Sequence, residues 1–206
     1  MKNLRTILLM GAAALITGAL VAQAQVPGVN STLNSVFTLA YDNSTMKPTY
    51  SSLADEFTLA SAATDVCTLQ GSATKTIKVR RVFVSGWATA VGTEPVELIK
   101  RSTAATTGTS VVDPIISYDS INVASGAQAE HYTANPTVGT AVGPILQQQV
   151  TFANLSTGVG TALIAELGER GQPVVLRGVA QNIAVNMLAQ TVTGGKLTCG
   201  FEWTEE

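Results

Sequence analysis

Short apolar stretches with a two-residue period recur along most of the chain, separated by glycine, proline, asparagine or serine–threonine clusters. Such alternation predicts strands with one buried face. After the N-terminal apolar run, no segment repeats its apolar residues with the 3.6-residue period of a helix over three turns. The predicted strands are 56–60, 65–70, 76–87, 95–101, 111–117, 128–133, 144–153, 162–166, 173–179, 181–189 and 196–204.

Many short strands with turn signals between them, and no repeat of fixed length, predict an all-β fold. We expect a two-sheet antiparallel β-sandwich resembling a jelly roll. Within 76–87 the apolar parity changes between Ile77 and Val82, which predicts a β-bulge or a crossing between sheets at Arg80–Arg81. The Thr193-Gly194-Gly195 segment predicts a hairpin turn between the last two strands.

Residues 1–24 have the order of parts found in a secretory signal peptide. Lys2 and Arg5 precede the uncharged apolar run 7–21, and Ala22-Gln23-Ala24 offers small residues to signal peptidase. The alternative is a membrane anchor, but the run is about fifteen residues long and a spanning helix needs about 20. The sequence therefore predicts cleavage after Ala24 and export, with no membrane span left in the mature chain.

Residues 25–50 form a polar segment that contains one alternating stretch, STLNSVFTLAY. Leu33, Phe37, Leu39 and Tyr41 share a parity there and would share one face of a strand. Two interpretations stay open, an N-terminal arm that adds a strand to a neighbouring molecule and an ordinary first strand. The main domain is predicted to span 51–206.

The chain has two cysteines, Cys67 and Cys199. Cys67 alternates with Leu69, and Cys199 alternates with Leu197, so both side chains are predicted to face the core. Export favours a disulfide between them, which would make their strands neighbours. The alternative is a pair of buried free thiols.

Charge and residue type narrow the possible functions. Charged residues are 13% of the chain and the net charge is −2. The composition therefore has no excess of positive charge that would bind the phosphates of a nucleic acid. Two cysteines and one histidine are too few for a zinc site, and no cofactor or metal is predicted. His131, the one histidine, lies near a proline turn, and no Gly-x-Ser-x-Gly motif is present.

We therefore predict a protein that is not an enzyme, with a secreted hydrolase built on paired carboxylates as the weaker alternative. Trp87, at the end of a predicted strand, and Tyr132 are candidates for an aromatic platform that binds a glycan.

Five segments carry a family resemblance. They are GSATKTIKVRRVFVSG at 71–86, LIKRSTAATTGTS at 98–110, YTANPTVGTAVG at 132–143, VVLRGVAQNIAVNM at 174–187 and EWTEE at 202–206. Over about 51–206 the chain resembles a family of small β-rich proteins of tailed phages and prophages that are regarded as virion structural proteins. The resemblance implies a non-enzymatic structural or surface-coating role, as in capsid decoration, and carries no catalytic residues.

These observations predict a structural β-sandwich protein that coats or builds a surface assembly and whose main partner is itself, as a homo-oligomer or a lattice on a capsid or cell surface. One alternative is an exported filament subunit assembled by donor strands, and another is a secreted glycan-binding module. The predicted location is periplasmic, extracellular or on the cell surface, with the virion as the alternative.

Overall fold

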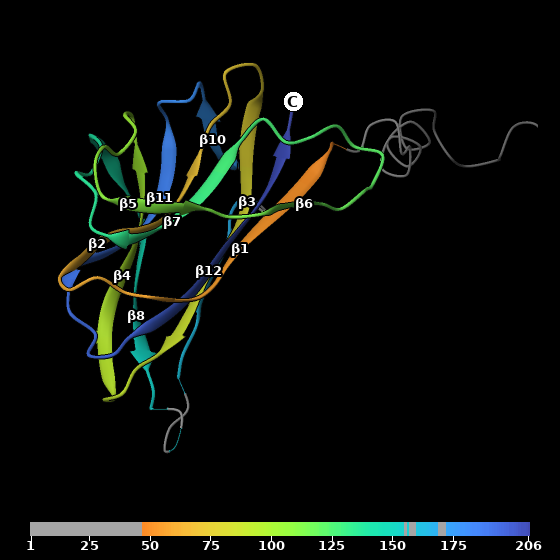
Figure 1. Ribbon diagram of the computed structural model, residues 1–206. Coiled ribbons are helices and arrows are strands. Elements are labelled where there is room, and N and C mark those ends of the chain that lie inside the picture. Colours follow the sequence, from red (N-terminus) through yellow and green to blue (C-terminus); the bar gives the residue numbers. More distant parts are fainter. Residues whose placement is uncertain (1–46, 155, 157–159, 169–171) are drawn as a thin grey trace, which may run out of the picture. The chain divides into compact units, whose positions relative to one another are not determined.

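Two antiparallel β-sheets pack face to face in the computed structural model, which describes residues 47–154, 156, 160–168 and 172–206 (Figure 1). The predicted all-β sandwich is confirmed. Among the described residues, no helix is long and apolar enough to cross a membrane. The predicted signal peptide and most of the predicted arm, including Leu33, Phe37, Leu39 and Tyr41, lie outside the described residues. The strands are β1 (Thr49–Thr58), β2 (Ala63–Gln70), β3 (Thr76–Trp87), β4 (Gly92–Arg101), β5 (Thr109–Val112), β6 (Ile115–Ser117), β7 (Gln128–Ala134), β8 (Ala141–Phe152), β9 (Leu163–Glu166), β10 (Val174–Arg177), β11 (Asn182–Gln190) and β12 (Lys196–Glu205).

The strand order is that of a jelly roll. Sheet A has the order β10-β3-β12-β1-β6, with β9 also paired to β3, and sheet B has the order β5-β7-β2-β11-β4-β8. Strands β1 to β4 alternate between the sheets, and so do β8 to β12 when β9 and β10 are counted together. β1 pairs with β12, β2 with β11, β3 with β10 and β4 with β8. These four pairings are those of one long hairpin that folds over into two sheets.

The core lies between the sheets and is built from the inward parity of each strand. Its largest fully buried side chains include Trp203, Tyr50 and Phe152. Tyr50 stacks on Trp203 with ring centroids 6.0 Å apart, and its hydroxyl donates to the Val123 carbonyl. Because Tyr50 belongs to this core, the domain begins at about Lys47 rather than at residue 51.

The predicted bulge in β3 is confirmed. Glu202 pairs with Arg81, whereas Trp203 pairs with Val79, so Arg80 is the extra residue. The strand predicted at 111–117 is instead two strands, because the chain leaves β5 at Asp113–Pro114 and enters β6 in the other sheet.

The predicted turn at 193–195 is present, and the Gly195 N–H donates to the Val192 carbonyl. The hairpin prediction is wrong, since β11 belongs to sheet B and β12 to sheet A. The turn passes between the sheets instead of joining paired strands. Local turn chemistry does not distinguish these two outcomes.

The Cys67–Cys199 disulfide is present, with Cα atoms 6.7 Å apart. Its two strands are not neighbours within one sheet, which corrects the predicted arrangement. Cys67 lies on β2 in sheet B, and Cys199 lies on β12 in sheet A, so the bond crosses the core. The strand beside β12 in the sheet is β1, which carries no cysteine.

Candidate interaction surface

Tyr132 does not form an exposed platform. Its side chain is only 5% exposed, and its hydroxyl donates to Glu130 Oε1 at 2.7 Å. Burial, followed by the hydrogen bond to the Glu130 carboxylate, raises the pKa of the Tyr132 hydroxyl above its ordinary value. Glu130 also accepts from Gln70 Nε2. Tyr132 is therefore part of a closed polar cluster and offers no ring face to a ligand.

A buried ion pair lies on the same sheet. Arg101 donates from Nε to Asp65 Oδ2 and from Nη2 to Asp65 Oδ1, both at 2.6 Å. Asn186 Nδ2 also donates to Asp65, and Arg101 Nη1 donates to the Gly139 carbonyl. Asp65 is fully buried and Arg101 is nearly so, which leaves no room for a substrate between them. This cluster fixes the loop around Gly139 to sheet B.

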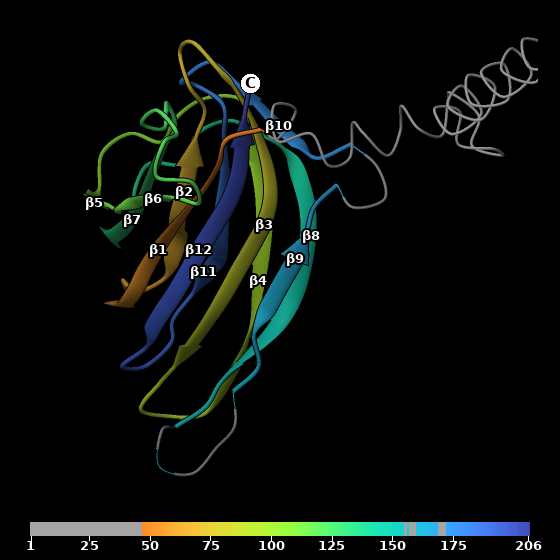
Figure 2. The same ribbon diagram turned by 90° about the vertical axis from the view of Figure 1, so that its right-hand side faces the viewer.

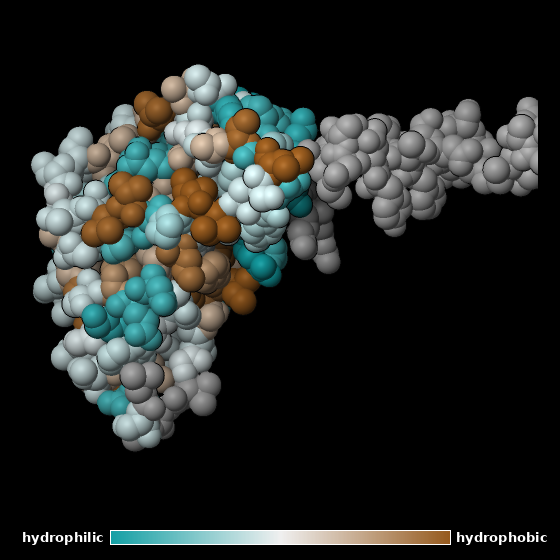
Figure 3. All heavy atoms as spheres, turned by 45° about the vertical axis from the view of Figure 1, so that its right-hand side comes forward, coloured by the Kyte–Doolittle hydropathy of each residue, from teal (hydrophilic) through white to brown (hydrophobic). Residues whose placement is uncertain are grey.

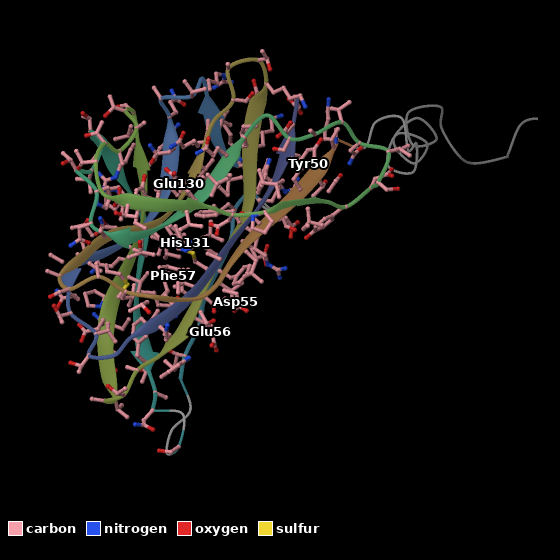
Figure 4. All side chains as sticks on the ribbon, in the orientation of Figure 1. Tyr50, Asp55, Glu56, Phe57, Glu130 and His131 are labelled. Atoms are coloured by element: carbon pink, nitrogen blue, oxygen red, sulfur yellow. A yellow bond between two sulfur atoms is a disulfide. The ribbon has the colours of Figure 1, made fainter. Side chains whose placement is uncertain are left out.

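His131 is half of a histidine–aspartate pair that joins β7 to the segment after β5. Its Nδ1 lies 2.7 Å from Asp113 Oδ1, and its ring packs against Phe57 with centroids 4.5 Å apart (Figure 4). Burial raises the pKa of the Asp113 carboxyl, and the hydrogen bond with His131 opposes this rise. Within the described residues, no serine hydroxyl hydrogen-bonds to the histidine, and no group of three or more metal-binding side chains occurs. His131 thus ties β7 to the segment after β5 through Asp113, and to β1 through Phe57.

The outer face of sheet A carries a row of apolar residues that runs across its strands. Strand register places Leu53 of β1 beside Gly200 of β12, Gly200 beside Phe83 of β3, and Phe83 beside Ile164 of β9. Leu53 is 45% exposed and Ile164 is 59% exposed. A Cβ atom on Gly200 would collide with the Phe83 ring, so the glycine lets Phe83 lie across β12. We call these four residues the apolar row.

Charged and hydroxyl residues border the apolar row. On one side, Glu202, Arg81 and Glu166 occupy the next position of β12, β3 and β9, and Arg81 Nε donates to Glu166 Oε1 at 2.5 Å. Tyr118 donates its hydroxyl to Glu202 at 2.9 Å. On the other side, Thr198 pairs with Ser85. An apolar strip with a polar border is the usual composition of a protein-binding surface.

The row lies in a shallow depression of about 430 Å³. Brown, apolar side chains gather on the side of the sandwich that Figure 3 turns toward the viewer, and Figure 2 shows β1, β12, β3 and β9 side by side on that side. The residues that line this depression are Ser51, Ser52, Leu53, Arg81, Phe83, Ser85, Tyr118, Ala162, Ile164, Phe201 and Glu202.

Trp87, the other platform candidate, lies half-buried at the end of β3 in a second depression of about 350 Å³. Glu56, Asn154 and Thr198 also line this depression. The Trp87 indole Nε1 is buried without a hydrogen-bond partner among the described residues. The structure therefore brings Trp87, but not Tyr132, to an open polar surface.

Sequence reasoning did not find the apolar row, although every one of its members lies in or beside a predicted strand. Leu53 preceded the first predicted strand, and Gly200 carries no signal of its own. The parity of β12 does place Gly200 and Glu202 on the face opposite Cys199. That signal was available, but only the register joins it to Phe83 and Ile164.

No family model, curated protein or solved structure matches the chain.

Proposed function

We propose that this protein is a non-enzymatic structural protein that associates with copies of itself and coats or builds a surface assembly. The observation that carries the proposal is the apolar row on the outer face of sheet A. Leaving side chains such as Ile164 in water has an energetic cost that burial in an interface removes. The charged and hydroxyl border would then fix the orientation of the neighbouring molecule.

Sedimentation velocity on the mature chain, 25–206, over a wide concentration range tests this proposal. We expect association that weakens at least about tenfold in Leu53→Lys/Ile164→Lys, because both lysines would have to lose water in the interface. The matched control is Val91→Lys/Val179→Lys, which replaces two exposed apolar residues outside the apolar row. A mature chain that stays monomeric at about 1 mM, where even a binding free energy of about −4 kcal/mol would give dimers, would contradict the proposal.

The location that fits this role is outside the cytoplasm. The disulfide is compatible with an oxidising compartment, and the signal-peptide pattern of residues 1–24 supports export. We propose that the mature chain begins at Gln25. Intact-mass measurement on protein from its native source tests this, and a mass that includes Met1 to Ala24 would contradict it.

Virion decoration is the more specific form of this proposal, and it rests on the sequence resemblance. Jelly rolls serve both as viral capsid proteins and as lectins, so the fold suits it without selecting it. The genes beside this one would separate the alternatives. Head or tail genes would support a virion protein, whereas export or surface-assembly genes would support a cell-surface role.

Glycan binding is the second candidate, and the depression at Trp87 favours it. An indole together with the Glu56 carboxylate, the Asn154 amide and the Thr198 hydroxyl is the mixture of apolar and hydrogen-bonding groups that binds sugars. Titration with cellohexaose, chitohexaose and laminarihexaose, followed by tryptophan fluorescence, tests this role. We expect any binding signal to disappear in Trp87→Ala, and the absence of a signal with all three sugars would count against the role.

A further inference from the structure

β8 forms one edge of sheet B. Among the described residues it pairs only with β4, in a register that runs from Gly92–Phe152 to Arg101–Ala141. In an antiparallel pair, alternate residues direct their N–H and C=O groups away from the partner strand. The far side of β8 therefore presents backbone groups that a further strand can pair with.

This edge is protected against pairing only in its first part, where two register shifts fall between Ala141 and Leu146. Its twelve residues include no charged side chain, and Pro144 is the one residue in it that cannot donate a backbone hydrogen bond. The end of the strand is already occupied, since the Thr161 N–H donates to the Thr151 carbonyl. The register with β4 is continuous only from Leu146 onward, so the regular open part of the edge is 146–150.

Leu146 shows that the core stops short at this edge. It lies on the same side of β8 as Val150 and Phe152, which are fully buried, and it pairs with the buried Leu98. Leu146 itself is 37% exposed. A strand added beyond β8 would cover Leu146 and extend the core.

The predicted arm has the properties of such a strand. Its alternating segment, 31–41, has eleven residues and no charge, so it is long enough to pair with the whole regular stretch 146–150. Leu33, Phe37 and Leu39 share one parity, so in a strand they would present one apolar face. On the core side of the sandwich, that face would lie next to Leu146.

We propose that segment 31–41 of one molecule adds as an antiparallel strand to the β8 edge of a second molecule. This inference rests on the proposed self-association and names a second contact that produces it. Each molecule has one donor segment and one acceptor edge, and these are different surfaces. Such a contact joins molecules head to tail and leads to a filament unless a ring closes.

Chain length favours a second molecule over the arm's own domain. From Tyr41 to Lys47 the chain can span about 20 Å at full extension. In sheet A both β3 and β9 contact β8, and they lie two and three strands from β1. The donor would lie one strand farther. With strands about 4.8 Å apart and sheets about 10 Å apart, the straight path is about 18–22 Å, but it passes through the core. A path around the surface is longer still.

Two variants of the mature chain, 25–206, test this contact. Phe37→Asp/Leu39→Asp blocks the donor, because both carboxylates would enter the core side of the new strand. Leu146→Lys/Gln148→Lys blocks the acceptor and changes only exposed side chains. We expect each variant alone to lose filament formation, raising the concentration needed at least about tenfold. When both variants also carry Leu53→Lys/Ile164→Lys, which disables the apolar row, a 1:1 mixture should give one heterodimer and no longer species, since one free donor meets one free acceptor.

Val91→Lys/Val179→Lys again serves as the matched control and should assemble like the parent chain. Circular dichroism and a count of free thiols check that each variant is folded with its disulfide formed. A mixture of the two blocked variants that stays monomeric would overturn the donor-strand contact. Blocked variants that lose thermal stability with no change in oligomer size would show that the arm binds its own domain, which also overturns it.

The apolar-row variant separates this inference from the proposed function. If both blocked variants assemble normally while Leu53→Lys/Ile164→Lys does not, self-association stands and the β8 contact is wrong. If the parent chain is monomeric throughout, both are wrong. A truncation used alongside should remove 25–46 and retain Tyr50, since Tyr50 belongs to the core.

Discussion

Cys67 and Cys199 lie opposite each other across the core and join the two sheets, with their Cα atoms 6.7 Å apart. They are 132 residues apart in the chain. The bond thus links β2 to the last strand, and it holds the sheets together at a point where strand pairing contributes nothing.

Loss of this bond should lower the free energy of unfolding by about 5 kcal/mol at most, the chain-entropy value for a closed loop of this length. Urea denaturation of oxidised Cys67→Ala/Cys199→Ala, compared with the oxidised parent, measures it. Reduction should lower the stability of the parent to that of the variant and leave the variant unchanged. Equal stability of the oxidised and reduced parent would contradict the expectation.

The Asp65–Arg101 pair should be costly to break from one side. Asp65→Ala leaves a buried guanidinium without its carboxylate, and we expect a loss of about 3–5 kcal/mol in the free energy of unfolding. Asp65→Leu/Arg101→Met removes both charges and should lose less than the single variant. Urea unfolding followed by circular dichroism measures both, and the opposite ranking would show that the pair is not electrostatically coupled.

Glu205 should make the fold sensitive to acid. Its carboxylate is buried and accepts from Lys75 Nζ, Ser125 Oγ and the Gly126 N–H. Burial raises its pKa, but these hydrogen bonds outweigh burial and hold the pKa below the ordinary value. A carboxyl whose pKa is lowered by folding stabilises the protein above its unfolded pKa. That contribution is lost as the pH falls through the lower pKa of the folded state.

Chemical denaturation at about pH 7 and about pH 3, on either side of the ordinary glutamate pKa, measures this effect. Glu205→Gln should be less stable than the parent at neutral pH, and the gap should shrink in acid. Glu94→Gln is the control, because the structure gives Glu94 no ion pair with a described residue. A gap that stays constant between the two pH values would contradict the assignment.

Gly200 should tolerate no side chain. A Cβ there would collide with the Phe83 ring and would lie 2.8 Å from the Ser52 carbonyl oxygen. We expect Gly200→Ala to lower the free energy of unfolding by about 1–3 kcal/mol, the usual cost of overpacking. Gly92→Ala is the matched control, since the nearest atom to its Cβ is the far end of the Glu94 side chain at 3.4 Å. Thermal unfolding compares them, and equal melting temperatures would contradict the close packing at Gly200.

Local sequence pattern determined where the strands are and which way their side chains point. Alternation placed Cys67 and Cys199 on inward faces, and a parity change in β3 located the bulge that the register assigns to Arg80. These features depend only on the two-residue period of a strand, which neighbouring residues specify by themselves.

Only the tertiary structure decided which strands meet. Alternation gives the face of a strand but not its partner, so the 193–195 turn and the cysteine strands were given the wrong neighbours. Tyr132 was a candidate for an open aromatic platform, yet neighbours cover both faces of β7. The apolar row and the β8 edge likewise arise from register and strand order across distant segments. Pairing is set by burial shared among all strands at once, and no single stretch of sequence contains that information.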